Sequence, residues 1–163
     1  MVRIEWTTHI AAPCERCFDL ARSIDVHMAS TGQTGERAIA GVTSGLIGRG
    51  ESVTWRGRHF GFRVTHTSVI TAFAFPNHFQ DSMVRGMFKR FCHDHYFHAR
   101  ADSTVMSDVM EFEAPYGVIG GLVERVLLRE HMRSLLQKRN NYIRQIAESG
   151  EWSKHLPLAG GLG

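Results

Sequence analysis

The sequence predicts an α+β domain in which helices cover one side of an antiparallel sheet of seven strands. Apolar and polar residues alternate along several segments that short turns separate, which is typical of half-buried strands. Apolar residues recur at three- and four-residue steps along one long C-terminal segment, which is typical of a helix packed on a sheet. The order is one strand, two short helices, six strands in series and one long helix.

The first element is a strand over residues 2–10, where the alternation begins. A helix follows Ala12-Pro13, because proline suits the first helical position and Glu15 suits the positive end of the helix dipole. A second short helix is expected from Ser23 to about residue 29, with the serine as its N-terminal cap.

The middle of the chain is rich in turn residues and then becomes a hairpin. Residues 30–50 contain many Gly, Ser and Thr residues around a strand at 37–40. The hairpin is expected to have strands at 50–56 and 59–70 and a turn about Gly57-Arg58. The residues of this hairpin expected to face inward are Glu51, Val53, Trp55, Phe60, Phe62 and Val64.

A further strand is expected over residues 77–84, followed by two long strands joined by a turn at Ala101-Asp102. With an even loop, residue 97 pairs with 106, 95 with 108, and 93 with 110. Side chains two apart share a face of a strand, so each long strand has one inward set. These inward sets are Phe91, His93, His95 and Phe97 on the first strand, and Thr104, Met106, Asp108, Met110 and Phe112 on the second.

The long helix is expected after Pro115-Tyr-Gly117 and ends near Glu148. Arg139 and Arg144 fall in its later turns, where positive charge complements the helix dipole. The domain is therefore expected to span residues 1–149, with residues 150–163 as a C-terminal tail that is frayed from Leu156 onward.

Composition narrows the class of protein. The chain has 163 residues, 43% hydrophobic and 21% charged, which suits one globular domain. The net charge is only +3 and the basic residues are scattered along the chain, so no nucleic-acid partner is expected. No secretory start or membrane-spanning stretch is visible, and we expect a cytoplasmic protein with its three cysteines reduced. Cys14-Glu-Arg-Cys17 lacks a second ligand pair or a redox-fold context, and is interpreted as small side chains in a helix.

Three short motifs carry a family resemblance, together with the order of elements. They are Ile10-Ala-Ala-Pro13-Cys-Glu15-Arg-Cys-Phe18, Gly117-Val-Ile-Gly120-Gly-Leu and Arg139-Asn140. Over residues 1–148 the chain resembles the START-like helix-grip superfamily, which includes birch-pollen-allergen-like proteins, lipid-transfer domains and bacterial polyketide cyclase/dehydrase relatives. The resemblance implies a curved sheet that grips the last helix, with a cavity between them for a small hydrophobic molecule. It carries over no catalytic residue.

Ionisable residues on the inward faces define the candidate site. Asp81, His93, His95 and Asp108 lie on consecutive strands and are expected to share one wall of the cavity. Three interpretations stay open: a buried hydrogen-bond network, a polar anchor for an amphipathic ligand, and a catalytic pair. In the catalytic interpretation, His95 oriented by Asp108 is a general base for aldol-type ring closure or dehydration of a polyketone.

The functional prediction is binding of a small hydrophobic or amphipathic molecule, with a cyclase or dehydratase as the alternative. No cofactor is expected, and no metal either, since alternating histidines such as His93-x-His95 are a weak signal for a ligand set. The oligomeric state stays open. The predicted ligand-binding residues are Trp55, Phe60, Phe62, Phe79, Asp81, Phe91, His93, Phe97, Met106, Met110 and Phe112.

Overall fold

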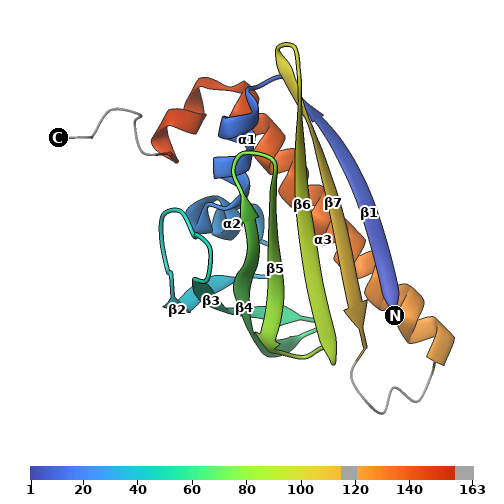
Figure 1. The fold of residues 1–163 in the computed structure, drawn as a ribbon. Coiled ribbons are helices and arrows are strands. Elements are labelled where there is room, and N and C mark those ends of the chain that lie inside the picture. Colours follow the sequence, from blue (N-terminus) through green and yellow to red (C-terminus); the bar gives the residue numbers. More distant parts are fainter. Residues whose placement is uncertain (115–120, 157–163) are drawn as a thin grey trace.

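The computed structural model describes residues 1–114 and 121–156 (Figure 1). Over this part of the chain, a single antiparallel sheet takes the strand order β1-β7-β6-β5-β4-β3-β2. The elements are β1 (Val2–Ile10), α1 (Cys14–Ala21), α2 (Ile24–Ser30), β2 (Arg37–Gly41), β3 (Ser52–His59), β4 (Phe62–Ala74), β5 (His78–Arg85), β6 (Arg90–Arg100), β7 (Ser103–Glu113), α3 (Gly121–Glu148) and the 3-10 helix η1 (Gly150–Lys154).

The first strand joins the sheet beside the last one, which places the N-terminal segment at one edge. Val2 pairs with Phe112 and Ile10 with Thr104, so β1 and β7 run antiparallel over their full length. The long helix α3 runs along one face of the twisted sheet (Figure 1) and contacts β1, α1 and α2. The fold is therefore the predicted α+β arrangement, with a curved seven-stranded sheet wrapped against the C-terminal helix.

The two short helices begin where the sequence predicts. Pro13 is the N-cap residue of α1, with an extended backbone, and Glu15 lies in the first turn. Ser23 caps α2, since its hydroxyl accepts a hydrogen bond from the Val26 backbone N–H. Helix α1 contacts β6 and β7, α2 contacts β2, and Phe18 of α1 is fully buried in the core.

The register between β6 and β7 confirms the predicted pairing. Phe97 pairs with Met106, His95 with Asp108 and His93 with Met110. Ala101 and Asp102 form the turn, in which Ala101 has a φ of 39°. An inward His–Asp pair on neighbouring strands is thus a consequence of alternation and an even loop.

The hairpin between β3 and β4 turns later than expected. Its turn is Phe60-Gly61, with φ values of 51° and 81°, because the favoured two-residue hairpin turn needs positive φ at both central residues. Gly57 instead lies within β3, where a Cβ atom would approach Glu36 Cγ to 2.6 Å. Phe62 is consequently 74% exposed beside the turn, so the prediction that it faces inward is wrong.

A further expectation needs correction, because Glu51 is exposed and its carboxylate accepts a hydrogen bond from the Gly48 backbone N–H instead of facing inward. At the start of the predicted tail, residues 150–154 form η1, and Trp152 packs on the core and under the Arg16 guanidinium at 4.2 Å. The predicted motif at residues 117–120 and the end of the tail at 157–163 lie outside the described residues.

The core has two parts on the helix-facing side of the sheet. The larger part surrounds Phe18 and reaches Ile143 and Ala147 of α3. The smaller part contains Phe88, Phe91, Met110, Phe112 and Leu136.

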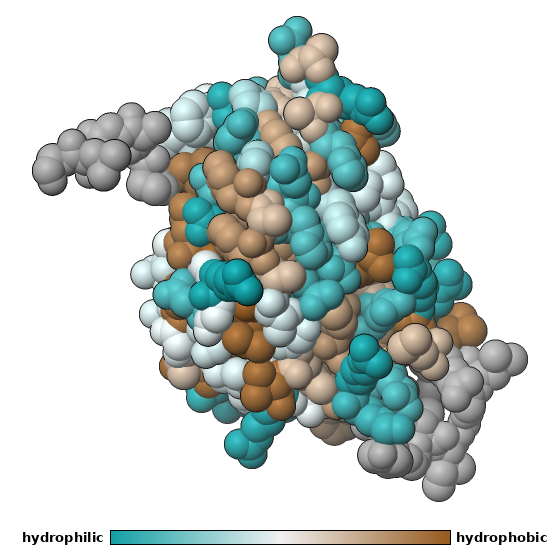
Figure 2. All heavy atoms as spheres, in the orientation of Figure 1, coloured by the Kyte–Doolittle hydropathy of each residue, from teal (hydrophilic) through white to brown (hydrophobic). Residues whose placement is uncertain are grey.

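On the surface shown in Figure 2, hydrophilic and hydrophobic residues are interspersed. In the described segments, no helix is long and apolar enough to cross a bilayer.

Candidate functional site

A cavity of about 160 Å³ lies between the sheet and α3. On the helix, its lining residues recur at three- and four-residue steps, which is the face that α3 turns toward the sheet. Apolar side chains from both layers make up most of the wall, and ionisable side chains interrupt it at two places. The lining from α3 is Leu128, His131, Met132, Leu135, Leu136 and Arg139; the lining from the remaining chain is His27, Thr31, Glu36, Trp55, Gly57, His59, Phe60, Val64, His66, Ser68, Asp81, Met87, Phe88, Phe91, His93, His95 and Met110.

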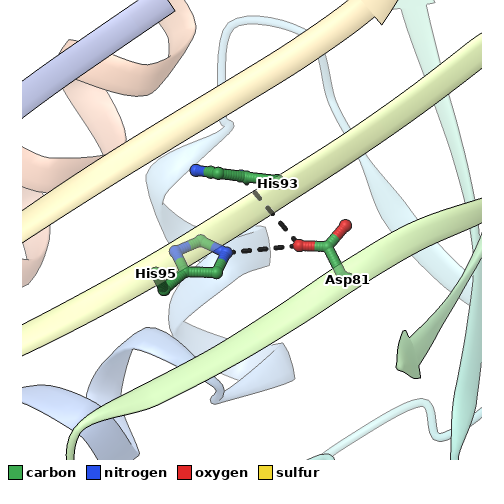
Figure 3. A group of neighbouring side chains, drawn as sticks. All are labelled: Asp81, His93 and His95. Carbon is green, nitrogen blue, oxygen red and sulfur yellow. Dashed lines mark hydrogen bonds and ion pairs between the residues drawn. The ribbon is translucent and has the colours of Figure 1, made fainter. Parts of the chain in front are cut away.

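The first polar region is built from neighbouring strands. Asp81 of β5 pairs directly with His93 of β6, and His95 lies two residues further along the same face. Asp81 Oδ2 is 3.2 Å from His95 Nε2 and 4.0 Å from His93 Nδ1, so both imidazoles converge on one carboxylate oxygen (Figure 3). The Asp81 side chain is 20% exposed, whereas those of His93 and His95 are 7% and 2% exposed.

A second carboxylate, Asp108 of β7, lies on the other side of the two imidazoles. His93 Nε2 is 2.9 Å from Asp108 Oδ1, and His95 Nδ1 is 2.8 Å from the same oxygen. The other oxygen of Asp108 accepts a hydrogen bond of 2.6 Å from the Asn140 side-chain amide on α3. The four side chains Asp81, His93, His95 and Asp108 are called the Asp–His cluster below.

Arg139 joins this cluster from α3, a role that the predicted complement to the helix dipole did not include. Its side chain is only 10% exposed, and its Nη1 atom is 3.8 Å from Asp108 Oδ1. Its Nη2 atom donates a hydrogen bond of 2.7 Å to the backbone carbonyl of Ala21. The guanidinium therefore ties the helix to α1 and brings the nearest permanent positive charge to Asp108.

The pKa values of the cluster follow from burial and from these contacts. Burial alone would raise the pKa of Asp81, but the hydrogen bond to His95 and the nearby charges lower it to about 2. For Asp108, burial likewise opposes the contacts with the two histidines, which hold its pKa well below the usual value. Burial, together with His95, lowers the pKa of His93. At neutral pH both carboxyls are thus ionised and His93 is neutral.

A second polar region of the cavity was missed by the sequence reasoning. Glu36 accepts a hydrogen bond of 2.7 Å from His27 Nε2 and lies 3.3 Å from His59 Nε2. His59 Nδ1 is in turn 3.1 Å from His131 Nε2 on α3. Burial would raise the pKa of Glu36, but its two histidine partners hold it well below the usual value. These four side chains are called the Glu36 cluster.

Of the Glu36 cluster, only His59 could have been found from the alternation of a strand. Val53, Trp55, Gly57 and His59 share one face of β3, and this series includes His59 only when the turn is placed at Phe60-Gly61. His27 lies on α2 with its imidazole stacked on Trp55 at 4.1 Å between ring centroids.

The cysteines lie apart from the cavity lining. Cys14 and Cys17 are free and buried in α1, and Cys92 is also free. Burial raises the pKa of the Cys17 thiol to about 11. A thiol that stays protonated at neutral pH is a poor nucleophile, which agrees with the interpretation of the C-x-x-C motif as helix packing.

The comparison with solved structures identifies the fold. A protein from Thermus thermophilus superposes with a TM-score of 0.71 at 18% identity, covering 91% of this chain and 100% of the other. A START superfamily protein from Mycobacterium smegmatis gives 0.66 at 15% identity, covering 88% and 98%. The fold is the START-like helix-grip fold. Ginseng major latex-like protein 151 from Panax ginseng also superposes, with 0.63 at 16% identity over 96% and 98%. No protein-family model and no curated protein matches the sequence.

Within this helix-grip fold, the predicted site residues fall into three groups. Six of the predicted ligand-binding residues line the cavity, and the predicted catalytic His95 lines it too. Asp108 is buried and is not part of the cavity lining. Phe79, Phe97, Met106 and Phe112 are buried in the core away from the cavity lining, and Phe62 is exposed. The six lining residues are Trp55, Phe60, Asp81, Phe91, His93 and Met110.

Proposed function

We propose that this chain binds a small amphipathic molecule in the cavity between the sheet and α3. The observation that carries the proposal is a largely apolar cavity whose wall is interrupted by the Asp–His cluster and the Glu36 cluster. Pockets that are mostly apolar with a few placed polar groups are typical of small-ligand sites. The apolar wall contributes burial, while the ionisable groups fix the orientation of a polar group on the ligand.

The proteins of known structure that share this fold have names that do not specify a ligand. A fold alone does not specify a function, so the choice of an amphipathic ligand rests on the polar groups of this cavity. The three free thiols agree with the reducing environment of the cytoplasm, where we place the protein.

Filling the cavity is expected to weaken ligand binding. The probe is anilinonaphthalene sulfonate, which combines apolar rings with a charged group, and the readout includes the fluorescence of Trp55, a lining residue. Met132→Trp places a bulky side chain into the cavity, and we expect its affinity for the probe to fall at least about tenfold, which is roughly 1.4 kcal/mol.

The matched control is Gln137→Trp, which adds the same side chain to an exposed position of α3. Its affinity is expected to stay within about twofold of the wild type, at one probe per chain. Wild-type protein that shows no saturable binding, or equal losses in the two variants, would refute the proposal. Native mass spectrometry of the purified protein checks for a ligand carried from the host.

A cyclase or dehydratase activity is the second candidate, because His95 lines the cavity and lies against a buried carboxylate. In this reaction the imidazole removes a proton next to a ketone carbonyl, and Asp108 stabilises the imidazolium that forms. His95→Gln is expected to abolish turnover of a poly-β-ketone mimic and to leave binding of the fluorescent probe within about threefold. Wild-type protein that turns over no such mimic would count against the activity and not against binding.

A further inference from the structure

Three potential metal ligands of the Asp–His cluster face one another. Donor atoms of Asp81, His93 and His95 all lie within 4.8 Å of one another, and within residues 1–114 and 121–156 they form the one such group of three. Figure 3 shows the carboxylate of Asp81 directed between the two imidazole rings. Two imidazoles and one carboxylate are a ligand set that suits zinc and non-haem iron.

Both nitrogens of His95 face carboxylates, with Nδ1 at 2.8 Å from Asp108 and Nε2 at 3.2 Å from Asp81. A neutral imidazole has one N–H and one lone pair, so one of its nitrogens must direct a lone pair at a carboxylate oxygen. A cation at one of the two nitrogens, either a proton or a metal ion, removes this repulsion.

The contacts of the two imidazoles indicate which nitrogens a metal ion would use. His93 donates from Nε2 to Asp108, so its Nδ1 carries the lone pair, and that atom faces Asp81. His95 Nε2 is hydrogen-bonded to Asp81 Oδ2, whereas its Nδ1 is buried 2.8 Å from Asp108 and has no hydrogen-bond partner among the described residues. A metal ion at Nε2 replaces the proton there, and a proton on Nδ1 can then be donated to Asp108. A carboxylate that orients ligating histidines through their second nitrogens is a common feature of metal sites.

The charges of the surrounding side chains point the same way. Asp81 and Asp108 contribute two negative charges, and Arg139 contributes the one positive charge among their nearest described neighbours. The two carboxylates therefore exceed the one permanent positive charge by one. A buried charge without a partner is costly, so an additional cation stabilises the folded state.

We infer that Asp81, His93 and His95 form a binding site for a divalent first-row transition metal ion, with Asp108 as the carboxylate that orients both imidazoles. Bonds of about 2.0–2.1 Å place neighbouring donors roughly 3–3.5 Å apart. The Asp81–His95 separation of 3.2 Å fits this spacing, and a modest ring rotation brings His93 Nδ1 in from 4.0 Å. Asp81, His93 and His95 also line the cavity, so the remaining coordination positions are open to water or to a ligand. The inference does not depend on the proposed binding function.

The Glu36 cluster is a weaker alternative. Its carboxylate already has His27 and His59 as partners, and the second nitrogen of His59 is used by His131. The histidines therefore satisfy one another and Glu36, and none of them has a buried nitrogen without a partner, as His95 has. This difference provides a control within the same cavity.

The test is titration of chelator-treated protein with Zn²⁺ by calorimetry and with Co²⁺ by visible absorption. We expect one metal ion per chain and Co²⁺ ligand-field bands that indicate nitrogen and oxygen ligands. Asp81→Asn and His95→Gln are each expected to lower the affinity at least about 100-fold, and Asp108→Asn about 10- to 100-fold. Far-ultraviolet circular dichroism of each variant checks that the fold is retained.

Two control variants make the result specific. Asp94→Asn alters a carboxylate on the opposite face of β6, where it accepts a hydrogen bond from His78, and Glu36→Gln alters the other cluster of the cavity. Both are expected to leave the affinity within about threefold. Absence of stoichiometric metal binding by wild-type protein, or an equal loss in Glu36→Gln and Asp81→Asn, would overturn the inference.

Discussion

Replacement of Asp108 by alanine is expected to lower the free energy of unfolding by about 3–5 kcal/mol, because it removes the shared acceptor of a buried network. Asp108 is 1% exposed and contacts His93, His95 and Asn140. Without it, the buried amide of Asn140 and the largely buried guanidinium of Arg139 lose their carboxylate partner. Buried donors that lose their acceptors carry the full cost of desolvation.

Urea denaturation in chelator-containing buffer measures this effect apart from any metal. Asp94→Ala is the matched control, since Asp94 accepts hydrogen bonds from His78 and Gln80 on the opposite face and its side chain is 19% exposed. Its expected loss is at most about 1 kcal/mol. Asp108→Asn keeps an oxygen acceptor and is expected to fall between the two. A loss below about 1 kcal/mol for Asp108→Ala would show that the network does not stabilise the fold.

The position of Asp108 opposite His95 followed from the sequence because β6 and β7 alternate over eleven residues each and meet in a two-residue turn. A slip by one residue would place charged Asp94 and polar Ser107 against the helix, so burial itself specifies the register. The same alternation identified Asp81 and His93 as inward-facing, and these residues line the cavity.

Other parts of the site depend on information that alternation does not contain. Whether an inward residue lines the cavity or fills the core depends on how α3 lies across the sheet, and a strand pattern does not specify that. Phe91 and Phe97 share one face of β6, yet only Phe91 lines the cavity, because Phe97 packs against Phe18 of α1. The partners of Glu36 come from α2, β3 and α3, so no single segment of sequence contains the pattern.

Arg139 shows that the angular position of a residue on a helix decides whether its charged side chain is buried. In the sequence it stands near other basic residues in the later turns of α3, which favours the interpretation as a complement to the helix dipole. Its angular position places it on the same side as Leu135, Leu136 and Asn140, which pack toward the sheet or line the cavity. The buried carboxylate of Asp108 and the carbonyl of Ala21 are the partners that offset the cost of this burial.

Replacement of Phe18 by alanine is expected to lower the free energy of unfolding by about 3–5 kcal/mol, an effect comparable to that of Asp108→Ala. Phe18 is fully buried, and its ring lies 5.3 Å from those of Phe79 and Phe97 between centroids. It also contacts Phe73 and Phe75, so its removal leaves a cavity among four aromatic rings that close packing prevents from collapsing fully. Chemical denaturation at constant pH measures the loss.

Phe62→Ala is the control for the truncation of an aromatic side chain, since Phe62 is 74% exposed and its loss is expected to cost less than about 0.5 kcal/mol.

The same two variants also test whether the aromatic core supports metal binding. Phe79 stacks on His95 at 4.2 Å, so the ring of Phe18 supports the Asp–His cluster from the side remote from the cavity. Phe18→Ala is therefore expected to weaken Zn²⁺ binding as well, whereas Phe62→Ala leaves it unchanged. Unaltered metal affinity in a destabilised Phe18→Ala protein would show that the imidazoles are held by Asp108 and the strand register without help from the aromatic core.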